Sequence, residues 1–202
     1  TYKTGAGAAD YEAKSGSTIL LTAASPTVTT AAGNLSFSTG DLVLSTNGTT
    51  TFTTGTTGAG SITVGGKING TATQSEALAI TSGTGAIQLQ GAIGDVQPLS
   101  TISINNASGS GTIEVTNIGA TNAGASSTVA IGNSTTNTLT LDGTVYKSTS
   151  PSPAVEFTSN PPSELVSPIA LLKVTSPVPE LIFRVLAPLS VSIAPPKSTS
   201  PP

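Results

Sequence analysis

Gly60-Ser61-Ile62-Thr63-Val64 decides the fold, because it recurs as Gly85-Ala86-Ile87-Gln88-Leu89 and as Gly111-Thr112-Ile113-Glu114-Val115. Asn137-Thr138-Leu139-Thr140-Leu141 is a fourth copy that lacks the glycine. The first aliphatic positions of the four copies, at 62, 87, 113 and 139, are almost evenly spaced. Aliphatic and polar residues alternate within each copy, which predicts a short strand with one buried and one exposed face.

Two further sets of aliphatic residues recur between these copies. A near-constant period of about 26 residues is typical of a solenoid, in which each coil buries its apolar face only against the next coil. We therefore expect an all-β fold, a parallel β-solenoid (β-helix) whose coils have two or three short sides. An antiparallel β-sandwich with strands every 8–12 residues stays open as the alternative. The two further sets are Leu78/Ile80, Ile102/Ile104 and Val129/Ile131, and Ile68, Ile93 and Ile118.

The region before residue 60 continues the alternation with less regular spacing, in residues 17–22, 34–38, 41–45 and 50–54. A longer repeat is also suggested, because Thr1-Tyr2-Lys3-Thr4 near the start is similar to Val145-Tyr146-Lys147-Ser148. If this repeat is real, the chain holds one long unit and the start of the next.

Glycine and proline divide the chain into two segments. All 22 glycines lie at or before Gly143, and 12 of the 14 prolines follow it. We expect residues 1–146 to form the repeat array and residues 147–202 to form a Pro-rich extended tail or docking arm. Because proline cannot donate to a sheet ladder, long strands are not expected in the second segment. It is nevertheless too apolar for a free linker. A Pro-rich stalk and a shifted reading frame remain alternatives for it.

The run Gly91-Ala92-Ile93-Gly94-Asp95-Val96-Gln97-Pro98-Leu99-Ser100-Thr101-Ile102-Ser103-Ile104 resembles the repeats of very large bacterial surface proteins of the filamentous-haemagglutinin and autotransporter adhesin type. The resemblance covers residues 60–141 well and does not extend to the second segment. It implies a secreted or cell-surface β-solenoid that serves as an adhesive or structural fibre.

Composition argues against catalysis and against several classes of partner. The chain has no His and no Cys, so the usual nucleophile–base arrangements cannot form. Its net charge of −3 disfavours nucleic acid, and no apolar run is long enough to span a membrane. Only 8% of the residues are charged, so few like charges keep copies apart. We expect no enzyme, no cofactor and no metal site, with self-association as the main interaction.

Two local patterns are weak candidates for binding sites. Gly65-Gly66-Lys67 lacks the spacing of a phosphate loop, and we interpret it as a tight turn with one solvated lysine. Asp10 and Glu12 form the only close acidic pair of the array, and nothing in the sequence supplies a third ligand. Three further aspartates each neighbour a glycine and are expected at corners, namely Asp41, Asp95 and Asp142.

Threonine-rich strands offer an alternative function, because stacked hydroxyl rows can bind carbohydrate or ice. Three segments show threonines at this spacing, namely Thr27-Val28-Thr29-Thr30, residues 49–54 and Thr138-Leu139-Thr140. Ile87-Gln88-Leu89 and Ile113-Glu114-Val115 interrupt it. High β propensity explains exposed threonines equally well. The leading expectation is therefore an extracellular structural or adhesive module that assembles into fibres or a surface layer, with strand addition by residues 147–202 as one route.

Overall fold

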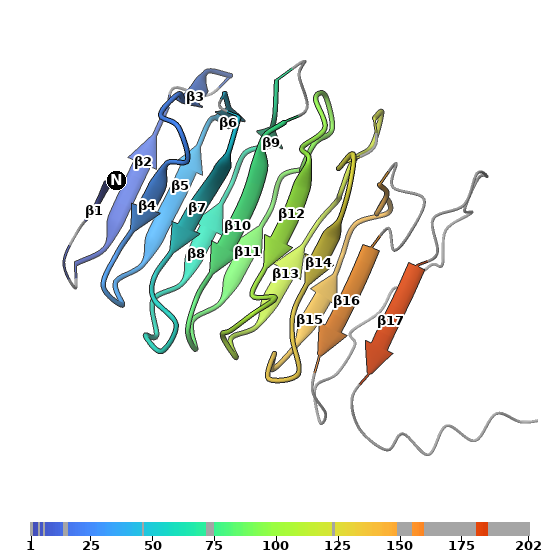
Figure 1. The fold of residues 1–202 in the computed structure, drawn as a ribbon. Coiled ribbons are helices and arrows are strands. Elements are labelled where there is room, and N and C mark those ends of the chain that lie inside the picture. The colour runs from blue at the N-terminus through green and yellow to red at the C-terminus, as the bar shows by residue number, and fades with distance from the viewer. Residues whose placement is uncertain are drawn as a thin grey trace, which may run out of the picture.

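The computed structural model describes residues 2–3, 5, 7–13, 16–45, 47–71, 75–122 and 124–148, together with the strands at 155–159 and 181–185. These residues form strands and turns and contain no helix. The strands stack side by side from the N-terminal end to β17 (Figure 1).

The largest sheet has eight parallel strands, in the order β1-β4-β7-β10-β12-β14-β16-β17. Each strand pairs with the equivalent strand one coil away, as Val28 does with Phe52 and Ile102 with Val129. We call it the first sheet. Its strands are β1 (Tyr2–Lys3), β4 (Thr27–Thr29), β7 (Thr49–Thr53), β10 (Ala77–Thr81), β12 (Thr101–Ile104), β14 (Val129–Ile131), β16 (Val155–Ser159) and β17 (Leu181–Val185).

Two smaller parallel sheets form the other sides of the coil. The second sheet has six strands and the third has three, and isolated parallel bridges extend the third side from Ile68 to Ile93, Ile118 and Tyr146. The second sheet contains β2 (Ala9–Glu12), β5 (Leu35–Thr39), β8 (Ile62–Val64), β11 (Ile87–Leu89), β13 (Ile113–Val115) and β15 (Leu139–Leu141), and the third contains β3 (Thr18–Leu21), β6 (Asp41–Leu44) and β9 (Ile68–Asn69).

The chain visits the three sides in turn and forms a three-sided parallel β-solenoid, whose coils recur at the period expected from the repeated motif. This confirms the predicted fold class. The sandwich alternative is wrong, because every pairing between the described strands is parallel and joins equivalent strands of successive coils. Each set of recurring aliphatic residues forms one side of the coil.

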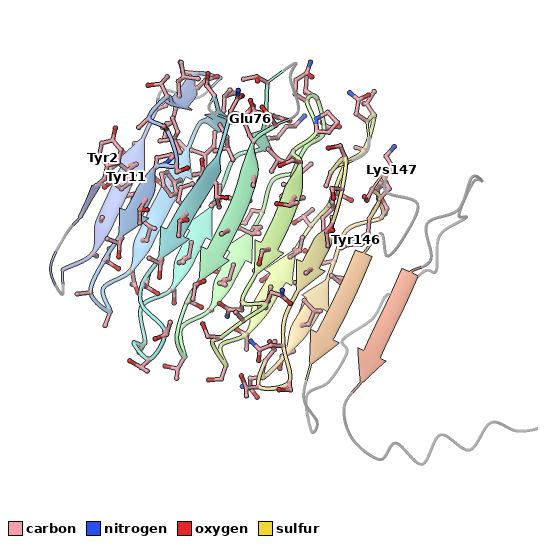
Figure 2. All side chains as sticks on the ribbon, viewed as in Figure 1. Tyr2, Tyr11, Glu76, Tyr146 and Lys147 are labelled. Carbon is pink, nitrogen blue, oxygen red and sulfur yellow. The ribbon has the colours of Figure 1, made fainter. Side chains whose placement is uncertain are left out.

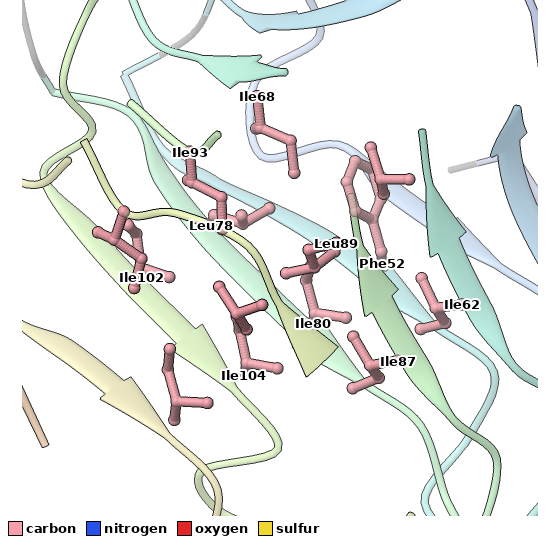
Figure 3. Close-up of a cluster of buried hydrophobic side chains, with 14 of the residues drawn as sticks. Phe52, Ile62, Ile68, Leu78, Ile80, Ile87, Leu89, Ile93, Ile102 and Ile104 are labelled. Atoms are coloured by element: carbon pink, nitrogen blue, oxygen red, sulfur yellow. The ribbon is translucent and has the colours of Figure 1, made fainter. Parts of the chain in front are cut away.

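The core consists of columns in which equivalent aliphatic side chains lie over one another. Ile87 lies in register between Ile62 and Ile113, and all three are at most 1% exposed. Figure 3 shows Ile80, Leu89 and neighbouring side chains filling the narrow interior between the sheets. Short coils would bury little surface alone, so their stability depends on this stacking.

Aromatic rings occupy the N-terminal part of the core. The ring centroids of Tyr11 and Phe37 are 5.2 Å apart, and those of Phe37 and Phe52 are 4.7 Å apart. Phe37 and Phe52 are fully buried, whereas Tyr2, on the first strand, is half exposed. The bulky rings therefore fill the interior at this end, where the spacing of the coils is least regular.

The glycine of the repeat is required by the close approach of successive coils. A Cβ atom at Gly85 would lie 2.1 Å from the carbonyl oxygen of Gly60, and one at Gly111 would lie 1.9 Å from that of Gly85. Any side chain here would overlap backbone atoms of the preceding coil. The recurring glycine therefore lets the corner stack tightly, which explains its place two residues before each strand.

Asparagine side chains at the corners link one coil to the next. The Asn34 amide oxygen accepts the Ser61 N–H at 3.0 Å, and that of Asn69 accepts the Val96 N–H at 3.0 Å. The Asn117 oxygen accepts the backbone N–H groups of Thr144 and Val145 at 2.9 and 3.0 Å. These bonds satisfy corner amides that have no partner in a sheet.

The structure does not support the long repeat as a structural unit. Tyr2 and Lys3 form a strand of the first sheet, whereas Tyr146 bridges to Ile118 on the third side of the coil. The two similar segments therefore occupy different sides.

The second segment contributes two strands to the first sheet. β16 pairs with β14 and β17 pairs with β16, each in parallel and each one coil after its neighbour. The other residues of 149–202 lie outside the described part of the chain. The division at residue 146, and the role of 147–202 as a tail or arm, therefore stay predictions.

Candidate interaction surface

The outward side of the first sheet carries only small uncharged residues on four neighbouring strands. Their inward neighbours are buried in strict alternation, so this surface follows directly from the strand pattern. We call it the Thr/Ser face. It consists of Thr27 and Thr29 on β4, Thr49, Thr51 and Thr53 on β7, Ala77, Ala79 and Thr81 on β10, and Thr101 and Ser103 on β12.

The residues of the Thr/Ser face form columns across the strands. Thr29, Thr53 and Thr81 are in register, so their hydroxyl groups repeat at the strand spacing of about 4.8 Å. A second column runs through Thr27, Thr51 and Ala79, about 6.6 Å away along the strands. The result is a flat and regular surface that presents hydroxyl and methyl groups without charge.

Sequence reasoning found the T-x-T strands but misjudged their continuity. The segments that interrupt the spacing, Ile87–Leu89 and Ile113–Val115, belong to the second sheet, on another side of the coil. Thr140, in β15, also lies on that other side, and Thr138 comes directly before the same strand. The hydroxyl rows are continuous only within one sheet, and the sequence does not state which strands share a sheet.

The second sheet presents a different outer surface. Asp10, Ser36, Thr63, Gln88 and Glu114 are in register there. This column therefore includes two carboxylates, whereas the Thr/Ser face has none.

Asp10 and Glu12 share one partner near the N-terminal end of the second sheet. The Ser38 hydroxyl lies 3.3 Å from Asp10 Oδ2 and 3.0 Å from Glu12 Oε1. The predicted acidic pair therefore does meet in space. Among the described residues, no three acidic, His or Cys side chains come close enough to hold a metal ion.

Lys67 belongs to a ladder of charges between coils. Its backbone N–H donates to Asp41 Oδ1 at 2.8 Å, and its ammonium group lies 2.7 Å from Asp95 Oδ2. The Asp95 hydrogen bond and charge raise the pKa of Lys67. The same hydrogen bond, with the Thr121 amide, lowers the pKa of Asp95. The Lys67 side chain is 44% exposed, so the expected solvated lysine is also ion-paired. Asp95 and Asp142 lie outside the strands, as expected for corners, whereas Asp41 is the first residue of β6.

Gly65 and Gly66 lie at a corner where successive coils approach closely. Cβ atoms there would lie 2.7 Å from Ser38 O and 2.1 Å from Gly40 O, so both residues pack directly on the preceding coil. A polar hollow of about 260 Å³ adjoins this corner between the second and third sheets. It is lined by Gly16, Ser17, Ser38, Thr39, Gly40, Asp41, Gly65 and Gly66.

Glu76 is the buried acid that sequence reasoning missed. Its side chain is labelled in Figure 2. It is 1% exposed, and its Oε1 atom accepts a hydrogen bond from the Thr71 hydroxyl. Its carbonyl oxygen accepts the Ser100 N–H at 2.7 Å. No pattern of alternation marks this residue, because it lies at a corner just before β10, where loop packing decides exposure.

Tyr146 ends the third side and is half-buried. The hydroxyl oxygen lies 2.8 Å from the carbonyl oxygens of Val115 and Thr116 and accepts the Gly143 N–H at 2.8 Å. Burial raises the pKa of Tyr146 to about 12. The Tyr146 hydroxyl therefore holds the corner at Gly143 against the preceding coil. At neutral pH the phenol stays protonated.

Comparison of the chain with protein-family models, with curated proteins and with solved structures found no match. In the part of the chain that the structure describes, no helix is long and apolar enough to cross a membrane. The geometry of the candidate surface is therefore the basis for any functional proposal.

Proposed function

We propose that this chain is a structural or adhesive module of an extracellular bacterial protein, and that copies associate side by side through the Thr/Ser face. The observation that carries this proposal is the uncharged, regular outer surface over β4, β7, β10 and β12. The resemblance of residues 91–104 to adhesin repeats of the filamentous-haemagglutinin and autotransporter type supports the extracellular setting.

Flatness and missing charge favour contact between copies. A parallel sheet with threonine, serine and alanine outward allows close approach, and no like charges oppose it. The face measures about 19 by 17 Å from strand and residue spacings, or roughly 300 Å² for each copy. That is below the roughly 800 Å² that each partner buries in a stable interface. One pairing is therefore weak, and lasting assembly depends on many repeated contacts, as in a fibre or surface layer.

Strand addition by residues 147–202 is a second route to assembly. Two strands of this segment already extend the first sheet in parallel within the chain. The same segment has the backbone pattern to extend the sheet of a neighbouring copy. A chain that lacks residues 147–202 should then form shorter assemblies. Equal assembly by the truncated and full-length chains would remove this route and leave the lateral contact untouched.

Paired lysine substitutions test the lateral contact. Thr51→Lys places a charge at the centre of the Thr/Ser face, and Thr63→Lys makes the same change on the outer side of the second sheet. We expect light scattering and electron microscopy to show that only Thr51→Lys suppresses assembly. If both variants assemble like the unmodified chain, or both fail while circular dichroism remains native, lateral contact through the Thr/Ser face is wrong.

A carbohydrate- or ice-binding solenoid is the second candidate, favoured by the in-register column of Thr29, Thr53 and Thr81. Binding to surface glycans or ice would need the hydroxyl groups, whereas self-association needs only an uncharged face. Thr53→Val should therefore weaken glycan capture or thermal hysteresis, while Thr140→Val on the second sheet should not. Absence of both activities in the unmodified monomer would exclude this candidate.

A further inference from the structure

We propose that Asn47 is a site of spontaneous deamidation, at which the Gly48 backbone nitrogen closes a succinimide ring with help from the Ser75 hydroxyl. The inference does not depend on the proposed function. It rests on the local geometry of Asn47 and Gly48 and on a second Asn-Gly pair in the chain, Asn69-Gly70, which is held in a different environment.

Asn47 and Gly48 lie in a bend just before β7, outside any strand. The Asn47 side chain is exposed, and water can therefore reach both the amide and the ring that would form from it. Within the described residues, the Gly48 N–H donates to no acceptor, while its carbonyl accepts the Ala77 N–H at 2.9 Å. The attacking nitrogen is thus not held by a hydrogen bond, and glycine adds no side chain to hinder its approach.

Ser75 supplies a hydrogen-bond donor to the group under attack. Its hydroxyl lies 2.6 Å from Asn47 Oδ1, across the gap between successive coils. That oxygen gains negative charge when a nucleophile adds to the amide carbon. A donor already aimed at it stabilises the charge as it develops, which is the principle of an oxyanion hole.

The chemistry needs only water and hydroxide. The Gly48 amide gives its proton to hydroxide, and its nitrogen bonds to Asn47 Cγ. The tetrahedral oxyanion then collapses, the Cγ–Nδ2 bond breaks, and the nitrogen takes a proton from water and leaves as ammonia. Water later opens the imide at either carbonyl, which yields aspartate or isoaspartate. The net change is an amide and water converted to a carboxylate and ammonium.

Asn69-Gly70 is an internal control with the same chemistry and a closed environment. Asn69 lies in β9 and is 7% exposed. Its Oδ1 accepts the Val96 N–H at 3.0 Å, so a donor to the amide oxygen is present at both pairs and does not distinguish them. The Gly70 N–H donates to Gln97 O at 3.0 Å, so the nitrogen that would attack is tied. The fold therefore protects this second pair.

Deamidation at Asn47 changes the chain next to the Thr/Ser face. It adds a negative charge beside Thr49, and isoaspartate also inserts a methylene into the main chain before β7. The Gly48–Ala77 hydrogen bond that aligns this strand with β10 would then be displaced. If the proposed lateral contact is correct, aged protein should assemble less well.

Trypsin separates the two pairs, because cleavage after Lys67 leaves Asn47 and Asn69 on different peptides. The folded full-length chain is incubated in neutral and mildly alkaline buffer, and fragmentation mass spectrometry follows conversion of amide to carboxyl at each position. We expect conversion at Asn47, faster at higher pH, and almost none at Asn69. In urea the two sites should react at similar rates, because the unfolded chain protects neither.

The Ser75→Ala variant tests the role of the hydroxyl. Loss of one neutral hydrogen bond to the oxyanion should slow conversion at Asn47 by roughly fivefold. Circular dichroism and the protection of Asn69 report whether the variant is still folded. The proposal is overturned if folded protein converts Asn47 no faster than Asn69. It is equally overturned if a folded Ser75→Ala chain converts Asn47 as fast as the unmodified chain.

Discussion

Replacement of Gly85 by alanine should separate two coils of the solenoid. The added Cβ atom would lie 2.1 Å from the Gly60 carbonyl oxygen and 2.4 Å from its carbon, whereas ordinary contacts begin at 3.4 Å. Both obstacles are backbone atoms and cannot rotate away. The corner must therefore open by about 1 Å to reach ordinary contact distances.

Opening of this corner would lengthen and weaken two backbone hydrogen bonds beside Gly85. Ile62 N–H donates to Ala86 O at 2.8 Å, and Thr84 N–H donates to Gly58 O at 2.8 Å. Weakening both costs about 2 kcal/mol, and packing strain adds about 1–3 kcal/mol. The lower entropy of the unfolded alanine chain offsets about 0.4–1 kcal/mol. We expect a net destabilisation of about 2–4.6 kcal/mol.

Urea denaturation followed by far-ultraviolet circular dichroism measures this effect. With a slope of about 2 kcal/mol per molar urea, the midpoint should fall by about 1–2 M. Gly7→Ala is the matched control, because a Cβ atom there would meet nothing within 4 Å. Its midpoint should stay unchanged or rise slightly.

Equal midpoints for Gly85→Ala and Gly7→Ala would refute the reasoning that glycine recurs in the motif for coil contact. A changed slope without a changed midpoint would instead mean that the solenoid unfolds in parts. The fraction of signal lost at each transition then has to be compared between the variants.

Three further predictions concern buried or half-buried polar groups. Thr50 Oγ1 is buried without a hydrogen-bond partner in the described structure. Thr50→Val should therefore stabilise the fold by about 1 kcal/mol in urea denaturation. Thr51→Val, on the outward side of the same strand, should not. Tyr146→Phe should destabilise the fold by about 1 kcal/mol near neutral pH. Because the folded pKa of Tyr146 is raised to about 12, its hydroxyl stabilises the fold fully below the unfolded pKa near 10, and this stabilisation is lost as the pH rises through about 12. The unfolding free energies of the two proteins should therefore become equal at alkaline pH. Because the pKa of Asp95 is lowered from the ordinary 3.8, its carboxylate stabilises the fold fully above pH 3.8, and this stabilisation is lost as the pH falls through the folded pKa. The difference in unfolding free energy between the unmodified chain and Asp95→Asn should therefore shrink in acid. A pH-independent difference for either variant would contradict the assigned contacts.

Much of the coil could be predicted from the sequence, because equivalent aliphatic residues recur at a nearly constant spacing. Ile62, Ile87 and Ile113 are spaced evenly, and the structure stacks them in one column. The same spacing continues through Val129, Val155 and Leu181, which pair in the first sheet. Prolines on both sides of the last two obscured this signal, since proline argues against strands without excluding short ones.

The candidate surface was less predictable. Thr29, Thr53 and Thr81 lie in one column although unequal lengths of chain separate them, because the difference is absorbed at the corners. Exposure at those corners also escapes prediction. Glu76 is buried and Asn47 is exposed, although both lie in polar segments just before a strand of the first sheet.

The amino-acid sequence by itself determined which residues face inward and how far apart the coils recur, because strand alternation and a constant period are local properties of the chain. Only the tertiary structure decided that the coil has three sides and which outward residues become neighbours. Those contacts join residues about one coil apart, and their register depends on how each corner folds. The Thr/Ser face and the contrast between the two Asn-Gly pairs both arise at that level.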